Sequence, residues 1–165
     1  MHARAAGRLE SLGFKRVYRY APGRADWRAA GLGMEGSLRA LPRAGDVVRR
    51  DAPTCGLDAS IEDARREADR LHSDFCLAVG DGELVFGRLR RDALSADPAL
   101  PVIDVMENGP TTIRADEDLA ALIGRMQVRH VANIIVSDPD GRLIGVLYRE
   151  DGEQLLAADQ PPPAP

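Results

Sequence analysis

Residues 140–147 read Asp140-Gly141-Arg142-Leu143-Ile144-Gly145-Val146-Leu147, a polar turn followed by an apolar run that contains a glycine. Another apolar run, Ile134 to Ser137, comes just before this turn. Two short apolar segments joined by a glycine-containing turn predict an antiparallel β-hairpin.

The same pattern occurs 58 residues earlier in the chain. Gly87 stands 58 positions before Gly145, and one-residue adjustments in the turn bring Asp81-Gly82 onto Asp140-Gly141. One offset kept through many apolar and turn positions indicates a duplicated unit. It also relates Asp46 to Asp104, Thr54 to Thr112, Ile61 to Leu119, Ala68 to Met126, and Cys76-Leu77-Ala78 to Ile134-Ile135-Val136.

Each copy predicts strand, helix, strand, strand, helix. A short extended piece with a threonine precedes a helix, then come the hairpin and a second helix after Leu89 or Leu147. Asp116 is the expected N-cap of the first helix in the second copy, and Asp58 or Ser60 in the first. The predicted class is α/β (α+β), with helices on one face of each sheet and the two units packed together. Helical spacing relates Leu119, Leu122, Ile123 and Met126, and likewise Ile61, Ala64, Ala68 and Leu71.

These units resemble CBS domains, which pair to form a Bateman module. Besides residues 140–147, the second copy carries the resemblance in Val105-Met106, in Pro110-Thr111-Thr112-Ile113 and in Arg149-Glu150-Asp151. The resemblance implies a first repeat over residues 41–97 and a second over residues 98–158.

Membership of this family implies a ligand site in the cleft between the repeats. CBS pairs commonly bind AMP, ADP, ATP or S-adenosylmethionine, and an aspartate contacts the ribose. Asp151, six positions after Gly145, matches that aspartate, whereas Tyr148 stands where the family has Ser or Thr. The implied second site comprises Thr112, Ile113, His130, Tyr148, Arg149 and Asp151.

The implied first site departs further from the family pattern and comprises Thr54, Arg90, Arg91 and Asp92. Asp92 comes five positions after Gly87, and Arg90 takes the Ser/Thr position. Either the strand end is rearranged or ribose recognition is lost, and the arginines would then hold phosphates.

Structural explanations compete with these assignments. An aspartate near a helix start, such as Asp151, favourably meets the helix dipole. Thr54 and Thr112 suit strands, and a lone His130 is more often a surface or packing residue. Arg88, Arg90 and Arg91 form a dense basic run, and such runs are usually solvated faces.

Residues 1–40 resemble the C-terminal end of a rhodanese domain without its catalytic cysteine loop. The expected elements there are a helix around Ala5 and Leu9, a strand over 17–20, and a short helix over 26–30 with Trp27 as its main anchor. The segment is expected to pack on the repeats or on a partner. Residues 159–165 are an expected flexible, proline-rich tail.

Composition narrows the function classes. The net charge of -4 is modest, and acidic and basic residues alternate along the chain, which argues against binding to nucleic acid or to anionic membranes. The two cysteines lack metal-ligand spacing, so no metal is expected. No apolar run spans a bilayer and no signal peptide is recognised, so a cytoplasmic location is expected.

Three functions remain. The first is a non-catalytic regulatory protein with an adenosyl ligand, no required cofactor, a homodimeric assembly and an unidentified protein partner. The second is a structural homodimer with degenerate sites. The third is a sulfurtransferase-related enzyme, which no catalytic motif supports.

Overall fold

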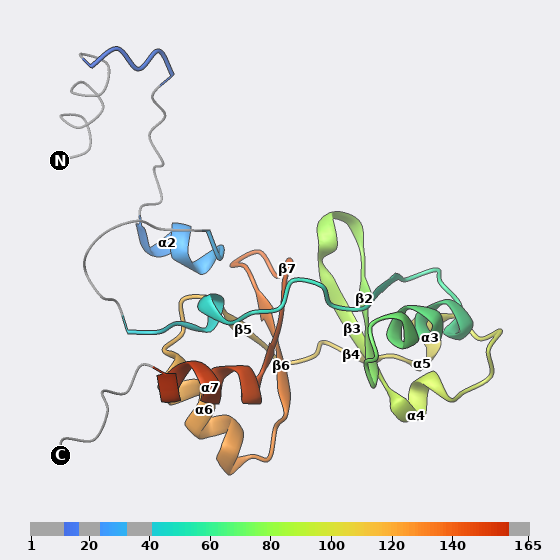
Figure 1. Ribbon diagram of the computed structural model, residues 1–165. Helices are drawn as coiled ribbons and strands as arrows, with labels where there is room; N and C mark the ends of the chain where they lie inside the picture. Colours follow the sequence, from blue (N-terminus) through green and yellow to red (C-terminus); the bar gives the residue numbers. More distant parts are fainter. Residues whose placement is uncertain (1–11, 17–23, 33–40, 159–165) are drawn as a thin grey trace.

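The computed structural model describes residues 12–16, 24–32 and 41–158 (Figure 1). The helix expected around Ala5 and Leu9, the strand expected over 17–20 and the tail lie outside the described residues. The helix α2, Arg24–Ala29, falls close to the short helix expected over 26–30, and Gly31 follows it with a φ of +67°.

Each repeat has the predicted order of strand, helix, strand, strand, helix. The first consists of β1 (Thr54–Gly56), α3 (Ile61–Arg70), β2 (Phe75–Val79), β3 (Val85–Arg90) and the short α4 (Arg91–Leu94). The second consists of β5 (Thr112–Arg114), α6 (Leu119–Val128), β6 (Asn133–Ser137), β7 (Leu143–Tyr148) and α7 (Arg149–Ala158). Helix α5 (Val102–Val105) and strand β4 (Glu107–Asn108) connect them, and single 3-10 turns lie at Ala44–Asp46 and Asp81–Glu83.

The two sheets are built alike. β1 runs parallel to β2 and β2 antiparallel to β3, and β5, β6 and β7 repeat this arrangement. Gly87 pairs with Ala78 and Gly145 with Val136, and in both hairpins the register shifts at the next pair. The predicted duplication and its hairpins are therefore confirmed.

The helix starts are capped by side chains at equivalent positions. Ser60 accepts a hydrogen bond from the backbone N–H of Asp63, and Asp118 accepts one from Ala121 at 3.0 Å. Of the two expected caps in the first repeat, Ser60 is the one that serves. In the second repeat the expectation of Asp116 was wrong: Asp118 directly precedes the helix, and only from there can the carboxylate reach the third amide.

The segment that leads into each repeat pairs with a strand of the other repeat. We call residues 43–49 the first lead-in segment and residues 101–107 the second. Arg49 pairs with Val146 of β7, and Glu107 pairs with Arg88 of β3. The lead-in of the first repeat thus lies on the second repeat, and the reverse holds, so the repeats are interlinked (Figure 1).

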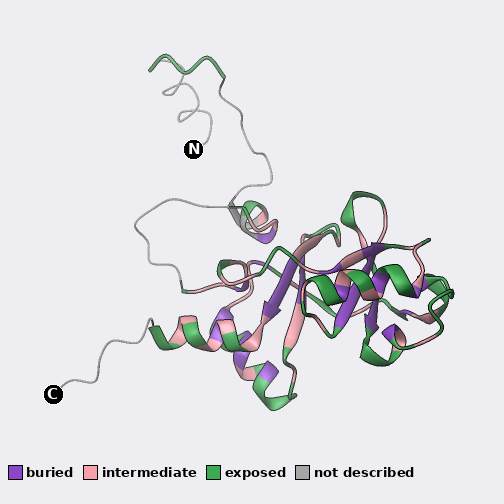
Figure 2. Ribbon diagram, turned by 45° about the vertical axis from the view of Figure 1, so that its right-hand side comes forward, coloured by how far each residue is buried: buried purple, intermediate pink, exposed green. Residues whose placement is uncertain are grey.

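Three apolar clusters hold the fold together (Figure 2). One lies under α3 in the first repeat, and one lies under α6 and α7 in the second. The third joins the sheets through Phe75, Leu77, Ile135 and Val146. Because side chains alternate along a strand, β2 sends Phe75 and Leu77 to this central cluster and Cys76 to the cluster under α3.

The segment at α2 contacts the second repeat. A Cβ on Gly31 would lie 3.2 Å from the Ile144 side chain, and Arg50 donates a hydrogen bond to the Gly31 carbonyl at 2.9 Å. Ala29 is fully buried, whereas Trp27, the expected anchor, is 37% exposed. None of the described helices is long and apolar enough to cross a membrane.

Candidate functional site in the cleft between the repeats

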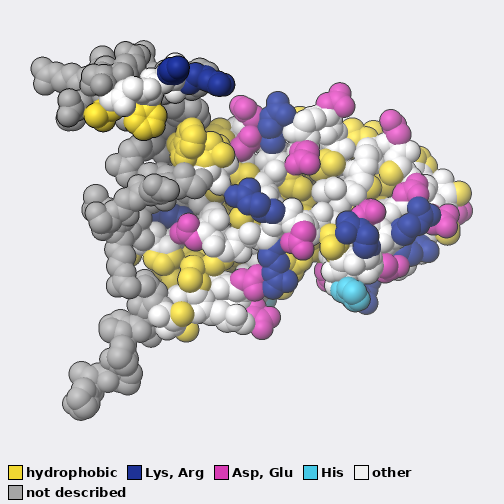
Figure 3. All heavy atoms as spheres, turned by 45° about the horizontal axis from the view of Figure 1, so that its top comes forward, with side chains coloured by type: hydrophobic (Ala, Val, Ile, Leu, Met, Phe, Trp, Pro, Cys, Tyr) yellow, Lys and Arg dark blue, Asp and Glu magenta, His cyan; other side chains and the backbone are white. Residues whose placement is uncertain are grey.

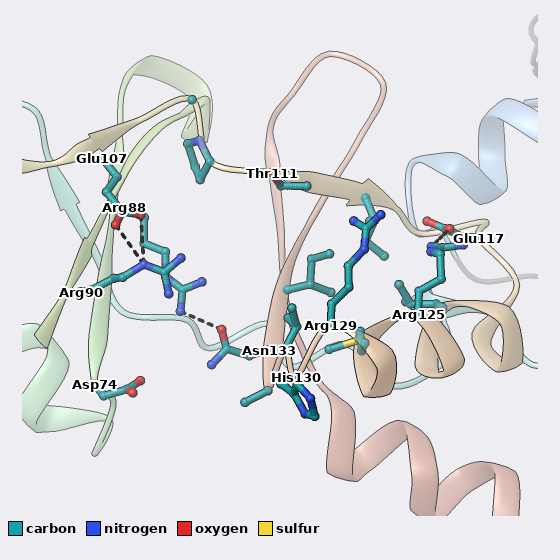
Figure 4. A pocket seen from close by; sticks show the side chains of 18 of the residues that line it. Asp74, Arg88, Arg90, Glu107, Thr111, Glu117, Arg125, Arg129, His130 and Asn133 are labelled. Carbon is teal, nitrogen blue, oxygen red and sulfur yellow. Dashed lines mark hydrogen bonds and ion pairs between the residues drawn. The ribbon is translucent and has the colours of Figure 1, made fainter.

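A candidate site is a cavity of about 810 Å³ between the two repeats, which we call the inter-repeat cleft. One wall comes from β3 of the first repeat and from β4, which pairs with it, and the other from β5, α6 and the start of β6 in the second repeat (Figure 4). Four arginines line it: Arg88, Arg90, Arg125 and Arg129.

Two of these arginines are already paired with carboxylates. Arg90 donates from Nε to both Glu107 oxygens at 3.0 Å, and Arg125 forms an ion pair with Glu117. No ion pair of Arg129 is found among the described residues. The third acidic residue of the lining, Asp74, makes none within the described part of the chain either. Each wall of the cleft therefore has an arginine without an ion pair among the described residues, Arg88 on one wall and Arg129 on the other, and either could attract an anionic group of a ligand.

Arg88 differs from the others because it is buried, with only 9% exposed. Its guanidinium lies 4.4 Å above the Phe75 ring, and its Nη2 donates to the Asn133 side chain at 2.7 Å. Burial, followed by the positive charge of Arg90, lowers the pKa of Arg88 from its ordinary value.

A second, smaller pocket lies at the equivalent place on the other side, where Tyr148 meets the lead-in to β1. This Tyr148 pocket holds about 50 Å³. Arg49 lies across it, 4.5 Å above the Tyr148 ring, and donates two hydrogen bonds of 2.7 Å to the Asp151 carboxylate. The hydrogen bond to Asp151 is the main reason why the pKa of Arg49 is raised.

Burial raises the pKa of the Tyr148 hydroxyl, and the nearby Arg49 charge only partly offsets this. The phenol therefore stays neutral at physiological pH. It can donate or accept a hydrogen bond, but it brings no charge to the Tyr148 pocket.

The structure distributes the expected second-site residues over both pockets. Ile113 and His130 line the inter-repeat cleft, as does Thr111, whereas its neighbour Thr112 is exposed and outside the lining. Tyr148 lines the smaller pocket, with Arg149 and Asp151 in the first turn of α7 beside it.

Of the expected first-site residues, only Arg90 lines the inter-repeat cleft. Arg91 and Asp92 are exposed at the start of α4, and Thr54 is half-buried in β1. The cleft thus unites Arg90 of the first group with Ile113 and His130 of the second, because both repeats contribute to its walls.

The strand end of the first repeat is not rearranged. β3 and β7, and likewise α4 and α7, begin 58 residues apart. The residue equivalent to Asp151 is therefore Ala93, and Asp92 corresponds to Glu150. A shift of one helical position turns a side chain by about 100°, so the first repeat lacks the aspartate of the family pattern.

Sequence reasoning missed Arg129 and Asn133, and its interpretation of Arg88 as part of a solvated run was wrong, because Arg88 is buried. Arg88 left a signal, because it interrupts an apolar strand between Gly87 and Leu89 where the second copy has Val146. Arg129 and Asn133 left none, since exposed arginines and strand-end asparagines are common.

The two cysteines are free and buried, outside both pockets. The side-chain hydrogen bond with Cys55, and then burial, raise the pKa of Cys76. The described residues contain no group of three or more His, Cys, Asp or Glu side chains that could hold a metal ion.

Comparison with known families supports the second repeat directly. Residues 102–151 match the family model described as CBS domain. These residues form a CBS domain. No match to this chain is found among curated proteins.

Solved CBS-pair structures share the fold of the whole described core. The CBS domain pair of protein MJ0100, in complex with 5-methylthioadenosine and S-adenosyl-L-methionine, has a TM-score of 0.61 at 16% identity and covers 73% of this chain and 100% of its own. CBSX2 in complex with AMP gives 0.62 at 19% identity, covering 70% and 96%.

The cytosolic domain of the Mg²⁺ channel MgtE in complex with ATP gives a TM-score of 0.62 at 21% identity. It covers 68% of this chain and 48% of that chain, so the present chain spans about half of that domain. The described core thus has a CBS-pair fold, as predicted, while the resemblance of residues 1–40 to a rhodanese end stays a prediction.

Proposed function

We propose that this CBS pair is a non-catalytic regulatory module that binds an adenosine-containing ligand in the inter-repeat cleft. The observation that carries the proposal is the cleft itself, about 810 Å³ between the repeats, with arginines on both walls. Small-molecule sites of roughly 300–1,000 Å³ are typical of proteins. Structures of similar fold are complexes with ATP, AMP and S-adenosyl-L-methionine.

The Tyr148 pocket does not compete for this role while Arg49 lies across it. Its 50 Å³ is far below the volume of an adenosine, and both Asp151 oxygens are taken by Arg49. Asp151 could contact a ribose only after Arg49 has moved away from it.

The test is thermal unfolding with AMP, ADP, ATP or S-adenosylmethionine added separately. A ligand at 100 times its dissociation constant stabilises the folded state by about 2.7 kcal/mol, a shift of several degrees. A shift with one of them, with no turnover of that ligand, is the expected result. No shift with any of the four contradicts the adenosyl ligand.

A second candidate function is homodimerisation, either together with ligand binding or instead of it. Large apolar side chains are exposed on the connecting helix α5 and at the end of α6: Ile103 is 52% exposed and Val128 is 81% exposed. Figure 3, by contrast, shows acidic and basic side chains interspersed over the face that it presents. Sedimentation at micromolar concentration distinguishes the outcomes, since a monomer contradicts the dimer.

A further inference from the structure

Arg88 is a buried cation that Asp74 and Glu107 attract only at longer range. It forms no ion pair with any described carboxylate. Within the part of the chain that the structure describes, its side chain forms one hydrogen bond, from Nη2 to Asn133, while Nε is buried without a hydrogen-bond partner. Taking a charged group out of water is costly unless it is paired, so this residue is expensive for the folded state.

The fold does not need an arginine at this place. The equivalent residue of the second repeat is Val146, which sits in the central apolar cluster and makes the same lead-in pairing through its backbone. β3 and β7 have the same length and register, so a valine serves the strand equally well. The cost of Arg88 therefore needs an explanation outside the sheet.

The surroundings of Arg88 suit an anion. Its side chain faces the inter-repeat cleft beside Arg90, and Arg129 lies on the opposite wall (Figure 4). The acidic residues of the lining are Asp74, Glu107 and Glu117, of which the last two are bound to Arg90 and Arg125. An oxyanion in the cleft would accept from the Arg88 guanidinium, since guanidinium groups bind phosphate oxygens with paired hydrogen bonds.

We propose that Arg88 anchors a phosphate group of the cleft's ligand, so that the cleft selects phosphorylated adenosines against adenosine and S-adenosylmethionine. That the ligand contains adenosine rests on the proposed function. That the cleft binds an anion at Arg88 does not. S-adenosylmethionine is disfavoured because its sulfonium would lie near uncompensated arginines. A bound anion would give Arg88 the direct ion pair that it lacks among the described residues.

The experiment compares wild type with Arg88→Met, which keeps an unbranched side chain over Phe75 and removes the charge. The control is Arg66→Met on the exposed face of α3, where the arginine is paired with Glu62 and Asp63. Calorimetric titration with ADP is expected to show binding about 10- to 100-fold weaker in Arg88→Met, the range for a lost charged hydrogen bond. Adenosine is expected to bind both proteins weakly and alike.

Stability without ligand gives a second readout. Arg88→Met is expected to unfold at the same temperature as wild type or higher, because a buried unpaired charge is removed. A purely structural arginine would instead give a lower unfolding temperature together with unchanged ADP affinity, and that result overturns the inference.

Inorganic pyrophosphate separates this inference from the proposed function and needs no variant to fold. Pyrophosphate is expected to raise the unfolding temperature of wild type above that in sodium chloride of equal ionic strength, and less in Arg88→Met. That result supports the anion site even if no adenosyl ligand binds. Equal binding of ADP to wild type and Arg88→Met overturns the anchor and leaves the adenosyl proposal standing. No effect of either ADP or pyrophosphate on wild type overturns the inference as well.

Discussion

Arg49 holds both carboxylate oxygens of Asp151, which lies 102 residues further along the chain, through Nε and Nη2 at 2.7 Å each. In the other half of the molecule Ala93 stands in the place of Asp151, and Glu107, the counterpart of Arg49, is bound instead by Arg90 at the end of β3. The lead-in residue is thus a cation in one half and an anion in the other: Arg49 binds the first turn of α7, whereas Glu107 binds the end of β3. The two pockets differ because one contact crosses its pocket and the other borders an open cleft.

Breaking the Arg49–Asp151 pair is expected to cost little stability. The two side chains are 55% and 24% exposed, so solvent screens their attraction. A double-mutant cycle of Arg49→Met and Asp151→Asn, measured by urea unfolding, is expected to give a coupling energy of about 0.5–1 kcal/mol. The more exposed pair Arg66–Asp63 serves as the control and should couple more weakly. Coupling above about 2 kcal/mol would mean that the pair is far less screened than its exposure indicates.

Removing Arg49 is expected to matter more for ligand binding than for folding. In Arg49→Met both Asp151 oxygens lose their partner and the Tyr148 pocket loses the side chain that crosses it. We expect calorimetry with AMP to show an added or tighter binding event in this variant, which disappears in Arg49→Met/Asp151→Ala. An AMP isotherm identical to wild type would show that Asp151 has no part in binding.

The two hairpin glycines are expected to differ in their tolerance of alanine. A Cβ on Gly145 would overlap the Arg49 carbonyl oxygen and lie 2.9 Å from its carbon, at a φ of +155°. A Cβ on Gly87 would meet only the flexible Met106 side chain. Gly145→Ala should therefore cost about 2–3 kcal/mol, and Gly87→Ala less, in urea unfolding. Equal costs would refute the close backbone approach at Gly145.

The capping box of α3 gives a pH-dependent prediction. Hydrogen bonds from the Ser60 side chain and then its backbone lower the pKa of Asp63. The folded state thus binds this proton more weakly than the unfolded state. The stabilisation is complete above the ordinary carboxyl pKa of about 4 and is lost as the pH falls through the lowered native pKa.

Ser60→Ala is accordingly expected to cost about 1 kcal/mol at pH 7, and the difference from wild type should shrink towards pH 2. Urea unfolding at a series of pH values measures it. The exposed Asp58→Ala should change nothing. A difference that grows as the pH falls would contradict the sign of the Asp63 shift.

Both thiols are expected to be unreactive in the folded protein. Cys55 and Cys76 are buried, and the raised pKa of Cys76 keeps it protonated. The hydrogen bond with Cys76 lowers the pKa of Cys55, so for Cys55 it is burial that keeps the reagent away. Because the thiolate is the nucleophile, modification by a disulfide reagent at pH 8 should be slow until urea is added. Sulfurtransferase turnover that is lost in Cys55→Ala or Cys76→Ala would favour an enzyme instead.

Much of the fold follows from local patterns in the sequence. The offset of 58 residues, the apolar spacing of α3 and α6 and the glycine turns predict two equal strand-helix-strand-strand-helix units, because strand and helix periodicity are set within a few residues. The sequence also predicts that the first repeat lacks the family's aspartate, since Ala93 stands six positions after Gly87.

Which pocket is open was decided only by the tertiary structure. Arg49 and Asp151 meet because the lead-in of the first repeat crosses to the second, and Arg88 faces the cleft because the sheets pack through Phe75 and Ile135. Local periodicity carries no information about such contacts, since side chains far apart in sequence meet only when apolar faces with no other cover pack together. The repeats are encoded in the order of residues, while the difference between their sites arises from packing.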